Sequence, residues 1–172
     1  MDHQFFRNQK ILRELLQERR VQIRLPSGSL FRWDLHLGDF RETSSDCRDP
    51  ELVFYDFYSP KSSPELWGYR SFELLYQRTE NRRRVGQGTT LITYCSSTSA
   101  RAAMLLAGFF VGYGASTPAK KETTLATTHF EDLNQPLGKS WLDRWRRSTR
   151  PLTEDSPSID LEKLAQFNRQ SS

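Results

Sequence analysis

Two short runs of apolar residues constrain the fold more than any other feature of this sequence. LVFYD (52–56) and TTLITYC (89–95) do not alternate between apolar and polar side chains. A strand with one buried face alternates, whereas a strand covered on both faces is apolar along its length. The two runs therefore predict central strands of an α/β sheet, with LVFYD covered on both faces.

Helix signals follow both runs. Residues 63–65, Ser-Pro-Glu, are typical of the N-cap and first turn of a helix, which we expect to end near Glu80. Either Ser97 or Thr98 caps a second helix, which stops at Gly108. A helix is therefore predicted to follow each buried run.

Two further apolar segments, 109–114 and 123–129, predict short strands, and the basic segment 80–88 predicts a loop. Strands that alternate with helices are typical of a sheet with helices on its faces. We therefore predict a three-layer, mainly parallel α/β sandwich.

The chain before the first buried run has a different pattern. VQIRL (21–25) and LFRWDLHL (30–37) alternate, and the PSGS between them is turn chemistry, so they predict a β-hairpin at the edge of the sheet. Residues 41–50 predict a polar loop. Residues 3–20 predict an amphipathic helix that is capped by Asp2 and has its apolar residues on one face: Phe5, Leu12, Leu15 and Leu16.

The end of the chain changes character. Residues 137–152 predict a short basic helix, 153–158 a linker, and 159–170 a marginal last helix. The apolar positions of the basic helix are Leu137, Trp141, Leu142 and Trp145. The two tryptophans are more typical of packing on the sheet than of exposure.

Composition limits the partners. The longest apolar run, 102–113, is too short to cross a bilayer, and the first ten residues lack the apolar core of a signal peptide. Cys47 and Cys95 are too few for a disulfide framework. We therefore expect a cytoplasmic chain without a membrane partner. Its net charge of +4 permits a nucleic-acid partner without requiring one.

No cluster of metal ligands is visible. The three histidines are scattered along the chain, and a cysteine does not lie near any of them in sequence: His3, His36 and His129. We therefore predict no metal site.

Two acids follow predicted strands. In open α/β sheets, ligands bind outside the carboxyl ends of the strands. Asp39 ends LHLGD, where an ordinary Gly-Asp turn is an alternative interpretation. Asp56 ends LVFYD, and an acid that closes a core strand must be solvated or hydrogen-bonded, as it is in a cleft. The residues alone predict an α/β protein with a cleft.

Four segments carry a resemblance to a known family. LHLGD, LVFYDFYSPKSSPELW, GTTLITYCSSTSARAAMLLAGFFVGYG and KKETTLAT, in this order, resemble the methyltransferase domain of the MnmC-like family between about residues 12 and 152. That family completes the 5-methylaminomethyl-2-thiouridine modification at the tRNA wobble position. The resemblance implies a class I, Rossmann-like fold, S-adenosylmethionine as cofactor and tRNA as partner.

The resemblance also implies roles for single residues. Asp39 would accept a hydrogen bond from the adenine amino group, with Gly38 and the Phe40 backbone N–H beside the ring. Asp56 would orient the attacking amine and stabilise the ammonium that forms. The pocket wall would be formed by Phe57, Tyr58, Ser59, Pro60, Lys61 and Tyr94. Ordinary packing is an alternative interpretation for Tyr58 and Tyr94.

Basic residues are candidates for the tRNA contact. Arginines interleaved with tryptophans can stack on bases and bind phosphates, although most arginine runs, including residues 82–84, are solvated faces. The candidates are Lys120, Lys121, Arg144, Arg146 and Arg147.

The sequence departs from the family pattern at one point. The glycine-rich first strand and loop, and the acid after the second strand, are not present in the 172 residues. We therefore interpret 1–152 as a partial methyltransferase domain that binds S-adenosylmethionine weakly, and 153–172 as a linker and marginal helix. The alternatives are a non-catalytic RNA-binding remnant and a methyltransferase of another substrate class.

A sheet without those two strands has a gap beside LVFYD. Either the hairpin strand at 30–37 pairs directly with 52–56, or the edge stays open and permits self-association. The length of the loop at 41–50 favours direct pairing.

Overall fold

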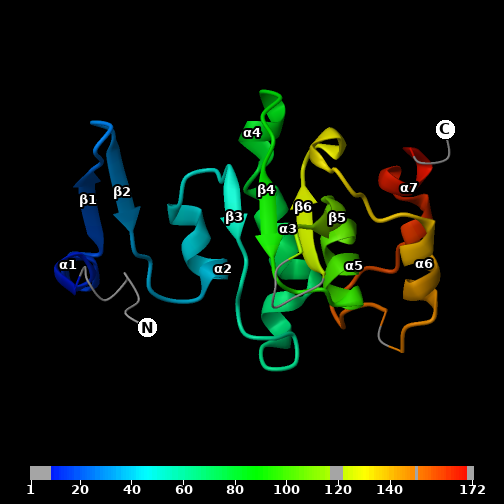
Figure 1. Cartoon of the computed structure of the whole chain (residues 1–172). Coiled ribbons are helices and arrows are strands. Elements are labelled where there is room, and N and C mark those ends of the chain that lie inside the picture. Colours follow the sequence, from blue (N-terminus) through cyan, green and yellow to red (C-terminus); the bar gives the residue numbers. More distant parts are fainter. Residues whose placement is uncertain (1–8, 117–121, 150, 170–172) are drawn as a thin grey trace. The chain divides into compact units, whose positions relative to one another are not determined.

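The computed structural model describes residues 9–116, 122–149 and 151–169 of the chain (Figure 1). The chain divides into two compact units, Met1–Asp46 and Cys47–Ser172. Each unit is described by itself.

The N-terminal unit contains the predicted helix and hairpin. Helix α1 spans Gln9–Glu18, and strands β1 (Arg20–Arg24) and β2 (Leu30–Asp34) form an antiparallel pair. The backbone N–H of Leu25 bonds the Ser29 carbonyl at 2.8 Å, which closes the predicted turn. The hairpin is therefore confirmed. Asp2 and Phe5 lie outside the described residues.

Two predictions for this unit are wrong. The hairpin is a two-stranded sheet of its own and does not form the edge of a larger sheet. The segment predicted as a polar loop contains helix α2 (Phe40–Thr43) and the 3₁₀ turn η2 (Ser44–Asp46). Asp39 accounts for the second difference, because it caps α2 by accepting a hydrogen bond from the Arg41 backbone N–H.

The C-terminal unit is built on a four-stranded sheet in the order β3-β4-β6-β5. β3 is parallel to β4, and β6 is antiparallel to both of its neighbours, so three of the four strands share one direction. The predicted α/β class is confirmed, but the sheet is mixed and not mainly parallel, because two of its three strand pairings are antiparallel. The strands are β3 (Leu52–Phe54), β4 (Thr90–Thr93), β5 (Phe110–Gly114) and β6 (Thr123–Thr127).

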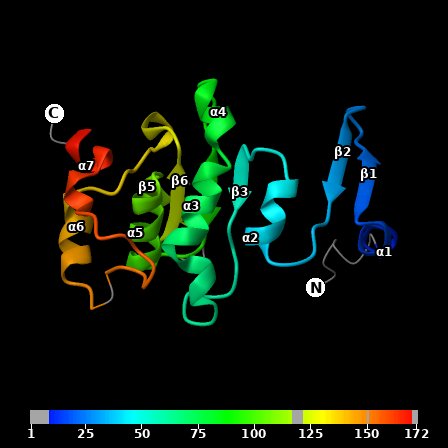
Figure 2. The ribbon, with the colours of Figure 1, turned by 180° about the vertical axis from the view of Figure 1, so that it is seen from behind.

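Helices α3 and α5 pack side by side in this unit (Figures 1 and 2). Helix α5 ends at Gly108 as predicted, because that residue adopts the left-handed conformation with φ 111°. The helices and 3₁₀ turns of the unit are η3 (Pro64–Trp67), α3 (Tyr69–Gln77), α4 (Glu80–Arg84), α5 (Thr98–Ala107), η4 (Phe130–Asp132), α6 (Lys139–Arg146), η5 (Leu161–Lys163) and α7 (Ala165–Arg169).

The single helix predicted from Ser63 to Glu80 is wrong, because it is divided in two places. Gly68 has extended backbone angles and separates η3 from α3. Thr79 precedes a new helix, α4, where we predicted a loop. The continuous helix signal at 63–65 therefore describes only the first short turn.

The prediction of a central β3 is also wrong. β3 is an edge strand, and its side chains Leu52 and Phe54 are 47% and 75% exposed. Among the described residues β3 pairs with β4 alone, so the expected pairing with β2 is not observed. The apolar character of this run correctly predicted a strand. Burial of the strand on both faces needs neighbouring segments, which the described residues do not supply.

The opposite edge of the sheet, at β5, is covered by the chain itself. The Tyr113 N–H bonds the Gln135 carbonyl at 2.8 Å, and the Leu137 N–H bonds the Val111 carbonyl at 2.9 Å. The buried Gln166 side chain of α7 bonds the N–H and the carbonyl of Val111, each at 2.7 Å. The C-terminal segment therefore satisfies the β5 edge, which leaves β3 as the open edge.

The segment predicted as a linker is also held in place. The Asp155 carboxylate accepts hydrogen bonds from the backbone N–H groups of Tyr69 and Arg70, each at 2.9 Å, at the start of α3. A Cβ at Gly68 would lie 2.6 Å from Asp155 Oδ2, so this approach needs a glycine. The domain boundary near residue 152 stays a prediction.

A buried arginine links α5 to β6. Arg101 is 1% exposed, donates to Thr124 Oγ1 at 2.8 Å and to the Thr123 carbonyl at 2.9 Å, and pairs with Glu122. Burial acts to raise the pKa of Glu122, but the hydrogen bond and charge of Arg101, with Arg144, hold that pKa below its ordinary value. These partners therefore offset the cost of burying the Arg101 guanidinium in the core.

We expect Arg101→Ala to lower the free energy of unfolding by about 3 kcal/mol, because it removes one partner of a largely buried ion pair. Arg144→Ala is the matched control, since Arg144 contacts the same carboxylate at 3.4 Å from a side chain that is 45% exposed. Its effect should stay below about 1 kcal/mol. Urea unfolding measures both, and equal losses would contradict the role of burial.

Asp155 predicts a pH dependence of stability. Burial acts to raise its pKa, but hydrogen bonds from the Arg70 N–H, the Thr153 side chain and the Tyr69 N–H hold the pKa below the ordinary value. A depressed pKa stabilises the fold at neutral pH, and this contribution is lost as the pH falls from about 4 through the folded-state pKa.

Asp155→Ala should therefore lower the free energy of unfolding at pH 7 by about 1–2 kcal/mol, the usual value of a helix cap, with a smaller difference from the parent in acid. Asp160→Ala removes the cap of the short η5 and should cost less. Denaturant unfolding at several pH values measures this, and a loss for Asp155→Ala that does not change with pH would contradict it.

Candidate functional site

The parallel pairing of β3 with β4 brings two predicted site residues together at the carboxyl ends of these strands. Phe54 pairs with Ile92, and the next residue, Tyr55, donates its backbone N–H to the Ile92 carbonyl at 2.9 Å. The same register places Asp56 beside Tyr94, just beyond the carboxyl ends of both strands. This is where open α/β sheets bind ligands.

Tyr55 anchors this strand end. Its ring is 2% exposed and packs against Trp67 and Phe72, each at a centroid distance of 5.2 Å. Its hydroxyl donates to the Leu66 carbonyl, and Trp67 Nε1 donates to the Tyr58 carbonyl at 2.6 Å. The loop after β3 is therefore held from its first residues, which fixes the backbone on both sides of Asp56.

The side chains around Asp56 are open to solvent. Asp56 is exposed, and no described residue donates a hydrogen bond to its carboxylate. The rings of Phe57, Tyr58 and Tyr94 are 39%, 82% and 49% exposed. An ionised carboxylate only accepts hydrogen bonds, so Asp56 retains its acceptor oxygens for an amine donor. Tyr58 is too exposed to be a packing residue, and neighbouring atoms cover only about half of the Tyr94 side chain.

The rest of the predicted pocket wall forms a tight turn. The backbone N–H groups of Ser62 and Ser63 bond the Ser59 carbonyl at 2.9 and 3.1 Å, and the hydroxyls of Ser59 and Ser62 lie 3.1 Å apart. Pro60 is half-buried, and Lys61 is exposed. The turn therefore presents one cation, Lys61, beside the aromatic side chains.

The residues predicted to hold adenine lie in the N-terminal unit. Gly38 has φ 127°, which favours glycine. Asp39 caps α2, and its carboxylate also pairs with the Arg41 guanidinium. Hydrogen bonds from the Arg41 side chain and backbone hold the pKa of Asp39 below its ordinary value. Both carboxylate oxygens accept hydrogen bonds from Arg41, so the adenine role of Asp39 stays a prediction.

The predicted nucleic-acid residues at the end of α6 make contacts within the chain. Arg144 contacts the Tyr113 hydroxyl at 3.1 Å, Arg146 bonds Asp143 at 2.8 Å, and Arg147 donates to the Asp143 carbonyl at 3.1 Å. Lys120 and Lys121 lie outside the described residues. The nucleic-acid role of these five residues stays a prediction.

The tryptophans of the same helix are packed. Trp141 is 1% exposed and stacks on Phe167 at a centroid distance of 6.2 Å. Trp145 is half-buried and donates Nε1 to the Pro151 carbonyl at 3.0 Å. Both rings are packed rather than fully exposed, as expected, but the stacking partner of Trp141 is α7. Trp141 is therefore not open to bases.

Sequence reasoning missed four structural residues: Tyr55, Trp67, Arg101 and Asp155. Tyr55 and Trp67 border the candidate site, and Arg101 and Asp155 hold its supporting helices. The available signals were weak: a buried aromatic before Asp56, and an arginine among the alanines of α5.

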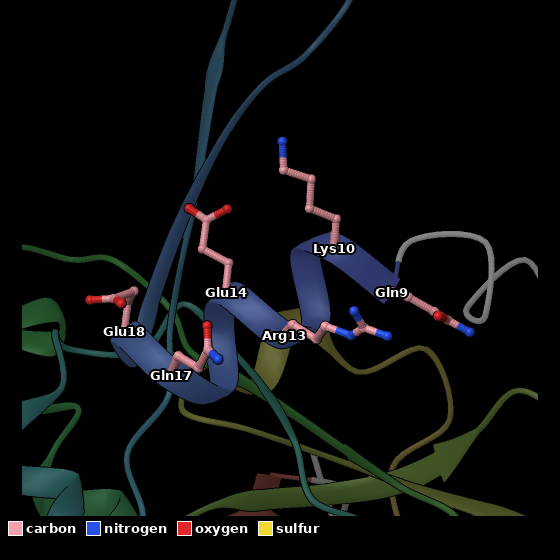
Figure 3. A pocket seen from close by; sticks show the side chains of 6 residues that line it. All are labelled: Gln9, Lys10, Arg13, Glu14, Gln17 and Glu18. Atoms are coloured by element: carbon pink, nitrogen blue, oxygen red, sulfur yellow. The ribbon is translucent and has the colours of Figure 1, made fainter.

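A pocket along α1 has no clear relation to this chemistry. It is lined by polar and charged side chains of one helix, and none is a predicted site residue (Figure 3): Gln9, Lys10, Arg13, Glu14, Gln17 and Glu18. Within the described ranges, no group of three or more His, Cys, Asp and Glu side chains is arranged to hold a metal ion. The described helices are also too short or too polar to span a bilayer.

Similar proteins were found by sequence. The chain is 30% identical over 103 residues to the tRNA 5-methylaminomethyl-2-thiouridine biosynthesis bifunctional protein MnmC of Hahella chejuensis, which covers 59% of this chain and 16% of that protein. It is 33% identical over 95 residues to the uncharacterized protein MJ0670 of Methanocaldococcus jannaschii, covering 54% of this chain and 25% of the relative.

A solved structure has a similar fold. The crystal structure of MNMC2 from Aquifex aeolicus matches with a TM-score of 0.61 and 22% identity, covering 86% of this chain and 46% of that one. This likeness supports a Rossmann-like methyltransferase fold. The chain therefore spans less than half the length of each of these relatives.

The family is shown by a broader match. A family model described as S-adenosyl-L-methionine-dependent methyltransferase matches residues 4–129, which is more than half of the chain. The matched range includes Asp39, Asp56 and Tyr94. The chain belongs to the S-adenosyl-L-methionine-dependent methyltransferase family and resembles its MnmC members.

Proposed function

We propose that this chain is part of an enzyme that methylates the side-chain amine of a modified wobble uridine in tRNA. The observation that carries the proposal is the open Asp56 carboxylate beside Tyr94, at the carboxyl edge of two parallel strands. The name of the Hahella chejuensis relative, which refers to tRNA 5-methylaminomethyl-2-thiouridine biosynthesis, supports this substrate.

Asp56 has the chemistry that an amine acceptor needs. Its carboxylate would accept a hydrogen bond from the attacking amine and direct the nitrogen lone pair toward the methyl group. The nitrogen becomes positively charged as it is methylated, and a fixed negative charge nearby stabilises that state more than the neutral amine. Bound S-adenosylmethionine would supply the methyl group.

The exposed aromatic side chains would form the wall of the pocket. Phe57, Tyr58 and Tyr94 offer ring faces to a planar base, and such faces also attract cations. Ser59 and Pro60 hold the turn, and Lys61 at its exposed tip would meet a phosphate of the substrate.

The cofactor would be held by its adenine end. Gly38, Asp39 and Phe40 would contact the adenine ring. The 172 residues contain no glycine-rich strand and loop for the methionine part, so we expect weak binding by this chain. We also expect it to act in the cytoplasm and to self-associate at the open edge of β3.

We expect Asp56→Ala to slow methyl transfer to a tRNA with an aminomethylated wobble uridine by about 10²–10³-fold, with little change in cofactor affinity. Transfer of a radioactive methyl group measures the rate. Glu51→Ala is the matched control, because Glu51 is an exposed acid that precedes the same strand at its opposite end.

Asp39→Ala should give the opposite result, with weaker cofactor binding and a smaller effect on the rate at saturating cofactor. An Asp56→Ala variant as fast as the parent would remove Asp56 from the chemistry and contradict the proposal.

A further inference from the structure

The hairpin of the N-terminal unit has two different faces. Val21 pairs with Trp33 and Ile23 with Phe31, so these apolar residues share one face, and Val21 is only 3% exposed. α1 packs against β1. Side chains alternate along a strand, so the neighbouring residues of β1 and β2 form the other face.

That second face is basic. Arg20 pairs with Asp34, Gln22 with Arg32, and Arg24 with Leu30 across the two strands. Three guanidiniums and one carboxylate therefore share this face, which gives it a net charge of +2. All three arginines are exposed.

Asp34 organises two of the three cations. Its oxygens accept from Arg20 Nε and from Arg32 Nε, the latter at 2.7 Å. These hydrogen bonds hold the pKa of Asp34 below its ordinary value, so it remains ionised. No described residue accepts a hydrogen bond from the terminal nitrogens of Arg20 or Arg32, which remain available to an anion.

The arginines of α6 differ in their surroundings. Arg144 lies against Glu122, and Arg146 lies against Asp143 and Glu162. Glu122, Asp143 and Glu162 therefore compensate the charge of this helix, whereas the hairpin has one carboxylate for three arginines. A polyanion gains more from the hairpin, because binding depends on the number of cations that neutralise phosphates.

We propose that the basic face of the hairpin, formed by Arg20, Arg24 and Arg32, is the main surface that binds the phosphate backbone of the tRNA substrate. This inference rests on the proposed function for the identity of the polyanion. The guanidiniums of this face would contact phosphates and not base edges, so the contribution of the face is affinity and orientation. Sequence specificity lies elsewhere in the substrate contact.

The test is the binding of a fluorescent tRNA transcript to the full chain, measured by anisotropy over a range of salt concentrations. The hairpin variant Arg20→Gln, Arg24→Gln, Arg32→Gln should bind at least about tenfold more weakly and reduce the salt slope by about two. The matched variant Arg144→Gln, Arg146→Gln, Arg147→Gln should lose less than about threefold. Circular dichroism and thermal melting confirm that each variant is folded.

A single substitution separates charge from structure. Asp34→Asn removes the one carboxylate of the face, so it should strengthen tRNA binding by about two- to fivefold and steepen the salt slope by about one. If Asp34 only holds the hairpin together, the same change weakens binding or leaves it unchanged, which would contradict the proposal.

Other results overturn different parts of the account. A parent chain that does not bind tRNA removes tRNA as the partner, and the proposed function fails with it. A parent that binds, with a hairpin variant as tight as the parent, overturns this inference alone. A DNA duplex of similar charge that binds as tightly as tRNA and loses as much affinity in the hairpin variant would show a general polyanion surface instead.

Discussion

The parallel pairing of β3 with β4 is the constraint on which the candidate site depends. The register from Leu52–Thr90 to Phe54–Ile92 aligns the carboxyl ends of the two strands, so Asp56 and Tyr94 follow at the same level. Tyr55 prolongs this pairing by one backbone hydrogen bond and buries its ring at the same time. A shift of one residue would turn Asp56 toward the other face and expose Tyr55.

The C-terminal segment supports this unit at two places. Gln166 pairs with the backbone of Val111 at the outer strand, and Asp155 caps the helix that follows the candidate loop. Both contacts join residues far apart in sequence, so the last part of the chain is integral to the C-terminal unit. Among the described residues β3 pairs on one side only, with β4, and its Leu52 and Phe54 side chains are exposed.

The sequence predicted which segments form strands and helices better than it predicted where those segments lie in the fold. The apolar runs and Gly108 correctly indicated strands and a helix end, because these signals depend on nearby residues. The apolar run of β3 could not reveal that it is an edge strand, since pairing depends on segments elsewhere. The break at Gly68 follows from Asp155, which is distant in sequence. At the candidate site, the order of the motifs indicated Asp56, but not Tyr55 and Trp67, which hold its loop.

The central claim is that the carboxyl ends of β3 and β4 form the methyl-transfer site of this methyltransferase chain. The most direct measurement is an amide NMR titration of the isotope-labelled chain with S-adenosylmethionine at concentrations high enough for weak binding. The account predicts shifts at residues 56–61 and at 94–96. Shifts confined to the opposite ends of these strands, around Glu51 and Gly88, or no shifts at all, would contradict it.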